Sequence, residues 1–292
     1  MDAMELRPLS TGEILDRTFT LYRQNFLLFL GISAIPHVLV LVLNLARVSI
    51  TFGSLLAPNA QRSHAAPLVP PSVGAGVAFI IIGLLLVVVM VIAYLLSQGA
   101  TVIAVSEIYL GRRITITESF RRVSGELLNL FGVVILNGLA TFAAFVCLII
   151  PGIYMMCRLV VCVPAALVEN IGARDSLERS FALTKGNAGR AFVILLLYFA
   201  VAIAAAALFT WPFTIIMLLV ARKDPSQMIF WMQATQVGTF VADVLVTPIL
   251  TIASAILYYD LRVRKEAFDI QLMMNPTGGA VPLSNSLPTM FS

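Results

Sequence analysis

Two ionisable residues, Arg158 and Asp243, lie inside apolar stretches of the sequence, where charged side chains are rare. An ionisable group within a bilayer is costly, so it usually pairs with an opposite charge or marks the path of an ion, a proton or a substrate. Arg158 and Asp243 are therefore candidates for an intramembrane pair. We favour a pair that fixes helix register over a substrate or proton site.

Residue types that serve catalysis or metal binding are scarce. His37 and His64 are the only histidines, and neither stands in a metal-ligand cluster, a phosphate-binding glycine loop or a Ser/His/Asp arrangement. Cys147, Cys157 and Cys162 all fall in apolar segments, where cysteine usually acts as a small core residue. The sequence predicts no enzyme, no metal site and no cofactor.

The composition indicates which elements must hold these residues. Hydrophobic residues make up 60% of the chain and charged residues only 12%, about half the charge of a soluble domain. Apolar runs of about 20 residues are long enough to cross a bilayer. Six occur, at about 26–50, 75–105, 129–150, 152–169, 190–220 and 233–259. The predicted fold is an all-α, polytopic membrane protein with about six transmembrane helices.

Prolines predict where these segments turn or bend. Pro151 and Gly152 separate the third and fourth segments, which favours a tight helical hairpin, with a single broken helix as the alternative. The fifth segment is too long for one membrane thickness and is expected to tilt, protrude or bend near Trp211 and Pro212.

The distribution of Lys and Arg predicts the orientation, since positive residues near span ends stay in the cytoplasm. Six spans place both termini on one side. That side holds Arg7, Arg17, Arg23, Arg112, Arg113, Arg121, Arg122, Arg174, Arg179, Lys185, Arg190, Arg262, Arg264 and Lys265, against Arg47, Arg62, Arg222 and Lys223 on the other. Both termini are therefore predicted to be cytoplasmic.

An internal repeat precedes the odd-numbered spans. Residues 13–25 align without a gap with residues 175–187, and a fainter third copy spans 114–126. The copies at 13–25 and 175–187 have identical residues at five aligned positions. Leu15, Arg17, Phe19, Leu21 and Asn25 match Leu177, Arg179, Phe181, Leu183 and Asn187. Apolar residues at i, i+4 and i+7 predict an amphipathic helix in each copy, although any helix beside a membrane could converge on such a pattern.

Each such helix would introduce a pair of spans. Ser10 with Glu13, and Thr115 with Glu118, have the capping-box spacing that begins a helix. The chain then divides into parallel units at about 10–110, 111–170 and 171–265, each a cytoplasmic amphipathic helix followed by a helical hairpin. Together they form one transmembrane domain, 1–270.

Two polar segments lie outside the spans. The proline-rich stretch at about 51–74 predicts an extended outer connection. Residues 271–292 lack periodicity and are rich in turn formers, which predicts a disordered cytoplasmic tail.

The basic amphipathic helices are suited to lying on an anionic inner leaflet. The candidate leaflet contacts are Arg17, Arg23, Arg121, Arg122, Arg179, Lys185 and Arg190. Positive-inside topology alone also explains most of this charge. A net charge of +4 gives no support for nucleic-acid binding.

One stretch, IIPGIYMMCRLVVCVPAALVEN followed by DSLERSFALTKGN, resembles the membrane domain of the glycerophosphoryl diester phosphodiesterase family. The opening LRPLSTGEILDRTFTLYRQN and the later YYDLRVRKEAFD extend the resemblance over roughly 5–269. It implies a stand-alone bacterial membrane protein. It implies no activity, because the family's catalytic domain is separate and absent here.

Two functions remain in view. The first is a non-enzymatic protein of the bacterial cytoplasmic membrane, a scaffold or accessory module that engages lipids, a partner protein or further copies of itself. The alternative is a small-solute or lipid transporter with a cavity near Arg158 and Asp243. A polar cavity in the helix bundle would distinguish the transporter from the scaffold.

Overall fold

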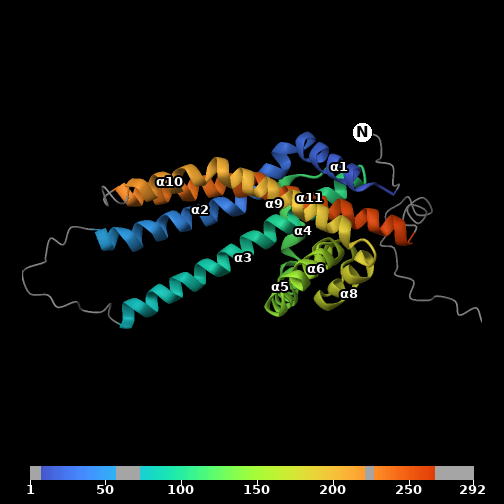
Figure 1. Ribbon diagram of the computed structural model, residues 1–292, viewed down its shortest axis with the longest axis horizontal. Coiled ribbons are helices and arrows are strands. Elements are labelled where there is room, and N and C mark those ends of the chain that lie inside the picture. Colours follow the sequence, from blue (N-terminus) through green and yellow to red (C-terminus); the bar gives the residue numbers. More distant parts are fainter. Residues whose placement is uncertain (1–7, 57–72, 221–226, 267–292) are drawn as a thin grey trace, which may run out of the picture.

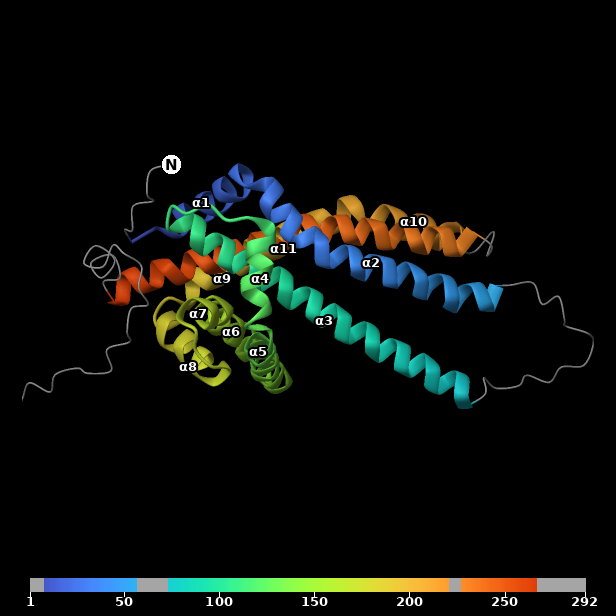
Figure 2. The same ribbon diagram turned by 180° about the vertical axis from the view of Figure 1, so that it is seen from behind.

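The computed structural model describes residues 8–56, 73–220 and 227–266, and within these ranges the chain is helical without strands. The helices are α1 (Thr11–Gln24), α2 (Phe26–Leu56), α3 (Val73–Tyr109), α4 (Ile116–Ser124), α5 (Leu127–Cys147), α6 (Ile149–Leu159), α7 (Cys162–Glu169), α8 (Ala173–Thr184), α9 (Ala188–Phe209), α10 (Trp211–Val220) and α11 (Met228–Glu266). Figures 1 and 2 show them from opposite sides.

Six stretches of helix are long and apolar enough to cross a membrane, as predicted. They are Phe26–Ser49, Gly83–Tyr109, Leu127–Cys147, Ile149–Glu169, Ala188–Phe209 and Met228–Glu266. Large apolar side chains remain exposed along them, including Leu27, Leu84 and Ile150. This is the surface of a protein whose solvent is lipid, and the fold is that of a multi-pass helical membrane protein.

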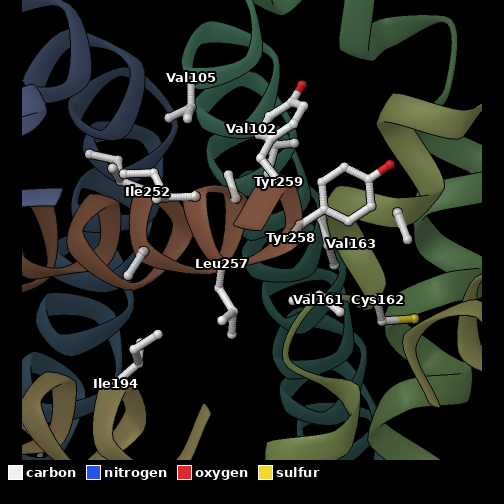
Figure 3. Packing of buried hydrophobic residues seen from close by; sticks show 14 of the residues in the cluster. Val102, Val105, Val161, Cys162, Val163, Ile194, Ile252, Leu257, Tyr258 and Tyr259 are labelled. Carbon is white, nitrogen blue, oxygen red and sulfur yellow. The ribbon is translucent and has the colours of Figure 1, made fainter. Parts of the chain in front are cut away.

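The helix α11 forms the centre of the molecule. It packs against α1, α2, α3, α7, α8, α9 and α10. From Thr251 to Val263 every residue is buried. Figure 3 shows Ile252, Leu257 and Tyr258 pointing from this helix into the surrounding helices. The tyrosine ring of Tyr259 stacks on that of Tyr109, with centroids 4.9 Å apart.

Most of the long helices share one direction, but the second pair of spans, which begins with α5, departs from it. In Figures 1 and 2, α2, α9, α10 and α11 run lengthwise, whereas α3 separates from α2 away from the short helices. The helix α5 is seen nearly end-on in both views, so it is steeply inclined to α11. We call the end that holds α1, α4, α8 and residues 251–266 the basic end, and the opposite end the far end.

Prolines explain three of the breaks between helices, because a proline ring clashes with the carbonyl four residues earlier. Pro151 ends α5 at Cys147, Pro164 falls four residues after Val160 at the break between α6 and α7, and Pro212 follows the end of α9. The fifth segment breaks near Trp211, as predicted.

The predicted turn at Pro151 and Gly152 is displaced in the structure. Leu148 is the extended residue between α5 and α6, with φ −167° and ψ 157°. Pro151 lies in the first turn of α6, where its missing N–H costs no helical hydrogen bond. At Gly152, a Cβ atom would lie 2.4 Å from the ring of Phe145. This glycine thus permits close packing of α5 on α6 and takes no part in the reversal itself.

The three short helices end at equivalent positions of the repeat. Asn25 separates α1 from α2, Glu126 precedes α5, and Asn187 precedes α9. The hydroxyl residues Thr18, Ser119 and Ser180, also equivalent, are each at most 1% exposed. Ser10 and Glu13 form the predicted capping box, and Thr115 accepts from the Glu118 amide. A small buried side chain in each copy lets the short helix lie close to its neighbours.

The predicted outer connection at 51–74 is shorter than expected, since α2 continues to Leu56 and α3 begins at Val73. The rest of that connection and the predicted tail at 271–292 lie outside the described residues.

Candidate functional site

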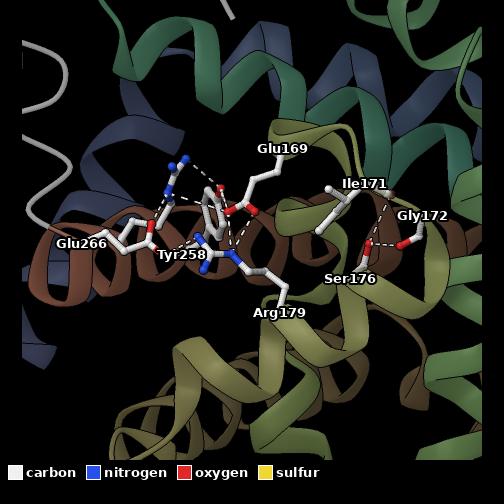
Figure 4. A network of polar contacts seen from close by, with 8 residues as sticks. Glu169, Ile171, Gly172, Ser176, Arg179, Tyr258 and Glu266 are labelled. Atoms are coloured by element: carbon white, nitrogen blue, oxygen red, sulfur yellow. Dashed lines mark hydrogen bonds and ion pairs between the residues drawn. The ribbon is translucent and has the colours of Figure 1, made fainter. Parts of the chain in front are cut away.

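A buried carboxylate, Glu169, organises the basic end at the junction of α7, α8 and α11. The Glu169 side chain is 5% exposed. Arg179 Nε donates to its Oε1 at 2.9 Å and its Oε2 at 2.8 Å, and the Tyr258 hydroxyl donates to Oε1 at 2.8 Å. Figure 4 shows Arg179 and Tyr258 converging on this carboxylate. Charge-assisted contacts of this kind are strong and directional.

Glu266 and Arg262 close the network around Glu169. Arg179 also pairs with Glu266, and Arg262 Nε donates to Glu266 at 3.1 Å. Arg262 Nη1 donates to the Tyr258 hydroxyl at 3.1 Å. Burial lowers the pKa of the Arg179 guanidinium, but Glu169 and Glu266 outweigh this effect and hold that pKa above its ordinary value. Arg179 therefore keeps its positive charge, and Glu169 and Glu266 balance this charge.

Asp260 is the second buried carboxylate, with a side chain that is 0% exposed. It accepts from the Leu9 amide at 2.6 Å, from Arg190 Nη1 at 3.0 Å and from Arg264 Nε at 3.0 Å. Arg190 and Arg264 also donate to the Leu9 carbonyl. One main-chain unit ahead of α1 is thereby fixed to α9 and α11.

A third, more exposed cluster joins α3 to α4. Arg122 donates to Glu107 at 2.7 Å and to Glu118 at 3.0 Å. These hydrogen bonds raise the pKa of Arg122 above its ordinary value.

The seven predicted leaflet contacts thus separate into two groups. Arg122, Arg179 and Arg190 have carboxylate partners, and Arg17 lies close enough to Tyr109 to interact with it electrostatically. Arg23, Arg121 and Lys185 are exposed. The sequence identified all seven as basic residues, but no pattern in it indicated which of them would pair with a carboxylate, or with which one.

The predicted pair of Arg158 and Asp243 is wrong. Arg158 Nη1 donates to the Tyr154 hydroxyl at 2.9 Å and Nη2 donates to the Phe181 carbonyl at 2.6 Å. Its guanidinium lies close enough to Lys265 to interact electrostatically. Asp243 and Lys265 stand on one helix about 33 Å apart at 1.5 Å per residue, so Arg158 belongs to the basic end and Asp243 to the far half. Asp243 instead interacts electrostatically with His37 and Tyr198.

Arg158, Lys185 and Lys265 form what we call the cationic trio. Lys265 lies within electrostatic range of both other cations, and Glu266 is the acidic group that acts on it. Lys265 Nζ donates to the Ala182 carbonyl at 2.6 Å and the Lys185 carbonyl at 2.9 Å, at the end of α8. Arg158 Nε is buried and has no hydrogen-bond partner among the described residues. Unlike Arg179 and Arg190, none of the trio forms an ion pair within the described ranges.

A cavity of about 490 Å³ lies between α3, α5, α6, α7, α9 and α11. Its wall contains the polar residues Tyr94, Gln98, Asn137, Thr141, Thr251 and Ser254. The remaining lining residues are apolar or glycine, and none of the lining residues is charged. The transporter prediction placed a cavity near Arg158 and Asp243, but neither residue lines this one.

No group of three potential metal ligands occurs in the described part of the chain. Sequence reasoning counted Arg262 among the basic residues of the cytoplasmic side but missed Tyr258, Asp260 and Glu266 as its neighbours in the buried network. The available signal was that the charged stretch after the last apolar segment continues the same helix without a break.

No family model, curated protein or solved structure matches this chain. The resemblance to the phosphodiesterase membrane domain stays a prediction.

Proposed function

We propose that this protein is a non-enzymatic scaffold or accessory module of the bacterial cytoplasmic membrane that binds anionic lipid headgroups of the inner leaflet. In this proposal the basic end faces the cytoplasm. The family resemblance and the positive-inside distribution of Lys and Arg support that placement. The observation that carries the proposal is the cationic trio, for which the described residues provide no carboxylate partner of the kind that neutralises Arg179 and Arg190.

The position of the trio suits a phosphate group. Basic pockets between transmembrane helices at the cytoplasmic side are typical sites for anionic headgroups. Lys185 is exposed, and Lys265 lies within electrostatic range of both Lys185 and the guanidinium of Arg158. Tyr154 and Ile153, on the same helix as Arg158, are 53% and 38% exposed and would face the lipid chains.

The repeat supports a scaffold. We propose that the three units are hairpins, each introduced by an amphipathic helix at the membrane surface. The short helices α1 and α8 then pack against α11, and α4 packs against α3. Carboxylates fix Arg122 of α4 and Arg179 of α8. A surface held in this way would be rigid, as a binding platform for lipids, a partner or a second copy requires.

The cavity favours transport of a lipid or a small solute as a second candidate. Transport needs a path from the cavity to each side of the membrane. Tyr258, one turn beyond the cavity residue Ser254 on α11, is instead held by Glu169 and Arg262. This cluster would have to open for a solute to leave toward the basic end.

Native mass spectrometry of the full chain, released from bilayers of phosphatidylglycerol and phosphatidylcholine, tests the headgroup proposal. We expect the wild type to retain phosphatidylglycerol, and Lys185→Gln with Lys265→Gln to lose about tenfold in that preference. Gln at position 265 keeps a donor for the α8 carbonyls. Arg174→Gln is the matched control, since its side chain is 86% exposed and pairs with Glu178. Equal retention by all three proteins would overturn the proposal.

A further inference from the structure

We infer that the cavity between α3, α5, α6 and α11 is a binding site for one acyl chain of a membrane lipid, which enters from the bilayer. The inference rests on the membrane placement within the proposed function and does not depend on headgroup binding. The volume of the cavity, about 490 Å³, falls in the range of about 300–1,000 Å³ that is typical of small-molecule sites.

The lining of the cavity selects an uncharged occupant. Apolar side chains such as Phe142, Met156, Leu159 and Val163 provide most of the wall, and none of the lining residues carries a charge. A charged or strongly hydrated solute would lose its water here without gaining a partner. A hydrocarbon chain has no hydration to lose and exchanges one apolar environment for another when it leaves the bilayer for such a wall.

The entrance lies on the lipid-facing surface. Four residues that line the cavity are also exposed on the outside of the molecule, namely Gly138 and the aromatic residues Tyr94 at 43%, Phe142 at 67% and Phe145 at 37%. By contrast, Leu159 and Val163 in the same wall are only 1% and 8% exposed. The cavity therefore extends from exposed aromatic residues of α3 and α5 to buried residues of α6 and α7.

The polar part of the wall fits the ester region of a lipid. Gln98 donates to the Tyr94 hydroxyl at 2.7 Å, and Thr141 donates to the Asn137 amide oxygen at 3.3 Å. These bonds leave the Tyr94 hydroxyl hydrogen and the Asn137 amide hydrogens as donors. Because unsatisfied donors are costly at membrane depth, a carbonyl acceptor in the cavity would be stabilised there.

This site is separate from the cationic trio. Met156 and Leu159 share one face of α6, and they line the cavity together with Val160, the residue that follows this helix. Arg158 is rotated by about 200° from Met156 at 100° per residue, so its side chain leaves the opposite face. The two sites therefore lie on different faces of α6 and share no residue, so they can be tested independently.

A photolabelling experiment on the full chain tests the inference. The probe is phosphatidylcholine with a diazirine on its acyl chain, in vesicles of phosphatidylcholine alone. We expect labels on Leu159 and Val163, which ordinary contact with the bilayer does not reach, together with labels on exposed Phe142. Excess unlabelled phosphatidylcholine should compete for the two buried positions.

Gly138→Leu blocks the cavity in this design. Gly138 lines it, and a Cβ atom at this position has no atom within 4 Å. We expect labelling of Leu159 and Val163 to fall about tenfold, with Phe142 unchanged. Gly83→Leu is the matched control, since Gly83 has equally open surroundings outside the cavity. Asn137→Leu is the second blocking variant should Gly138→Leu fail to fold.

Absence of label from Leu159 and Val163 in the wild type, or labels there that persist in both blocking variants, would overturn the inference. The probe carries no net charge. Failure here and loss of phosphatidylglycerol retention by the trio variants are therefore separate results.

Discussion

The two ends of α11 are held by different chemistry. At the basic end, residues 251–263 are buried, and Asp260 and Arg262 bind charged or hydroxyl partners on other helices or on α11 itself. At the far end, Phe230 is 64% exposed, and Gly238 lies against the carbonyl oxygen of Phe209. Lipid provides no hydrophobic driving force for helix association, so close backbone contact holds the helices together at the far end. Near water, at the basic end, directional polar contacts hold them together.

Removal of Glu169 should destabilise the basic end more than any other substitution considered below. Glu169→Ala leaves Arg179 without its bidentate acceptor and Tyr258 without an acceptor, in a site that is 5% exposed. Breaking a buried pair costs about 3–5 kcal/mol, so we expect a large fall in the unfolding midpoint in detergent micelles.

The control for that variant is Glu178→Ala, which removes a pair whose side chains are 86% and 69% exposed. Such a pair contributes about 0–1 kcal/mol. Similar midpoints for the two variants would show that burial of charge does not stabilise the basic end.

At the far end, adding a single methyl group should be enough to destabilise the packing of α9 on α11. In Gly238→Ala the new Cβ would lie 1.9 Å from the Phe209 carbonyl oxygen, so α9 and α11 must separate. Overpacking of this kind costs about 1–3 kcal/mol. Gly189→Ala, on α9 with no atom within 4 Å of its Cβ, should keep or slightly raise the melting temperature. If both substitutions were equally harmless, the close contact would not hold the far end.

The smallest expected effect concerns the buried hydroxyl of the repeat. Ser180 donates to the Arg158 carbonyl at 2.8 Å, and Ser180→Ala should cost about 1 kcal/mol in the same melting assay. Ser124→Ala is the control, because the hydroxyl of Ser124 is exposed and bonds within its own helix. A larger loss from Ser124→Ala would contradict the role assigned to the buried position.

The sequence predicted the six membrane-crossing helices well, because about 20 apolar residues in a row have few other structures open to them. It also predicted the break at Trp211 and the capping box at Ser10, since both depend on residues a few positions apart. The turn after α5 was displaced because the proline acts on a carbonyl four residues earlier and not at its own position.

The partners of charged residues could not be predicted in the same way. Asp260 meets the amide of Leu9, 251 positions away, and no local pattern records such a contact. Arg158 was assigned to Asp243 because both lie in apolar segments. The division of that segment into α6 and α7 places Arg158 beside α8 instead, where the Phe181 carbonyl accepts one of its hydrogen bonds, while Tyr154 of its own helix accepts the other.

The attachment of Leu9 to Asp260 also has a consequence for how the protein is made. Leu9 leaves the ribosome early, but its acceptor and the arginines that grip its carbonyl belong to α9 and α11. Domains fold as synthesis proceeds, and closing so long a loop is slow compared with local helix formation. The segment before α1 therefore cannot form its native contacts until α11 is inserted in the membrane. In a chain whose synthesis stops before residue 260, this segment would lack its hydrogen bonds and be accessible to proteases.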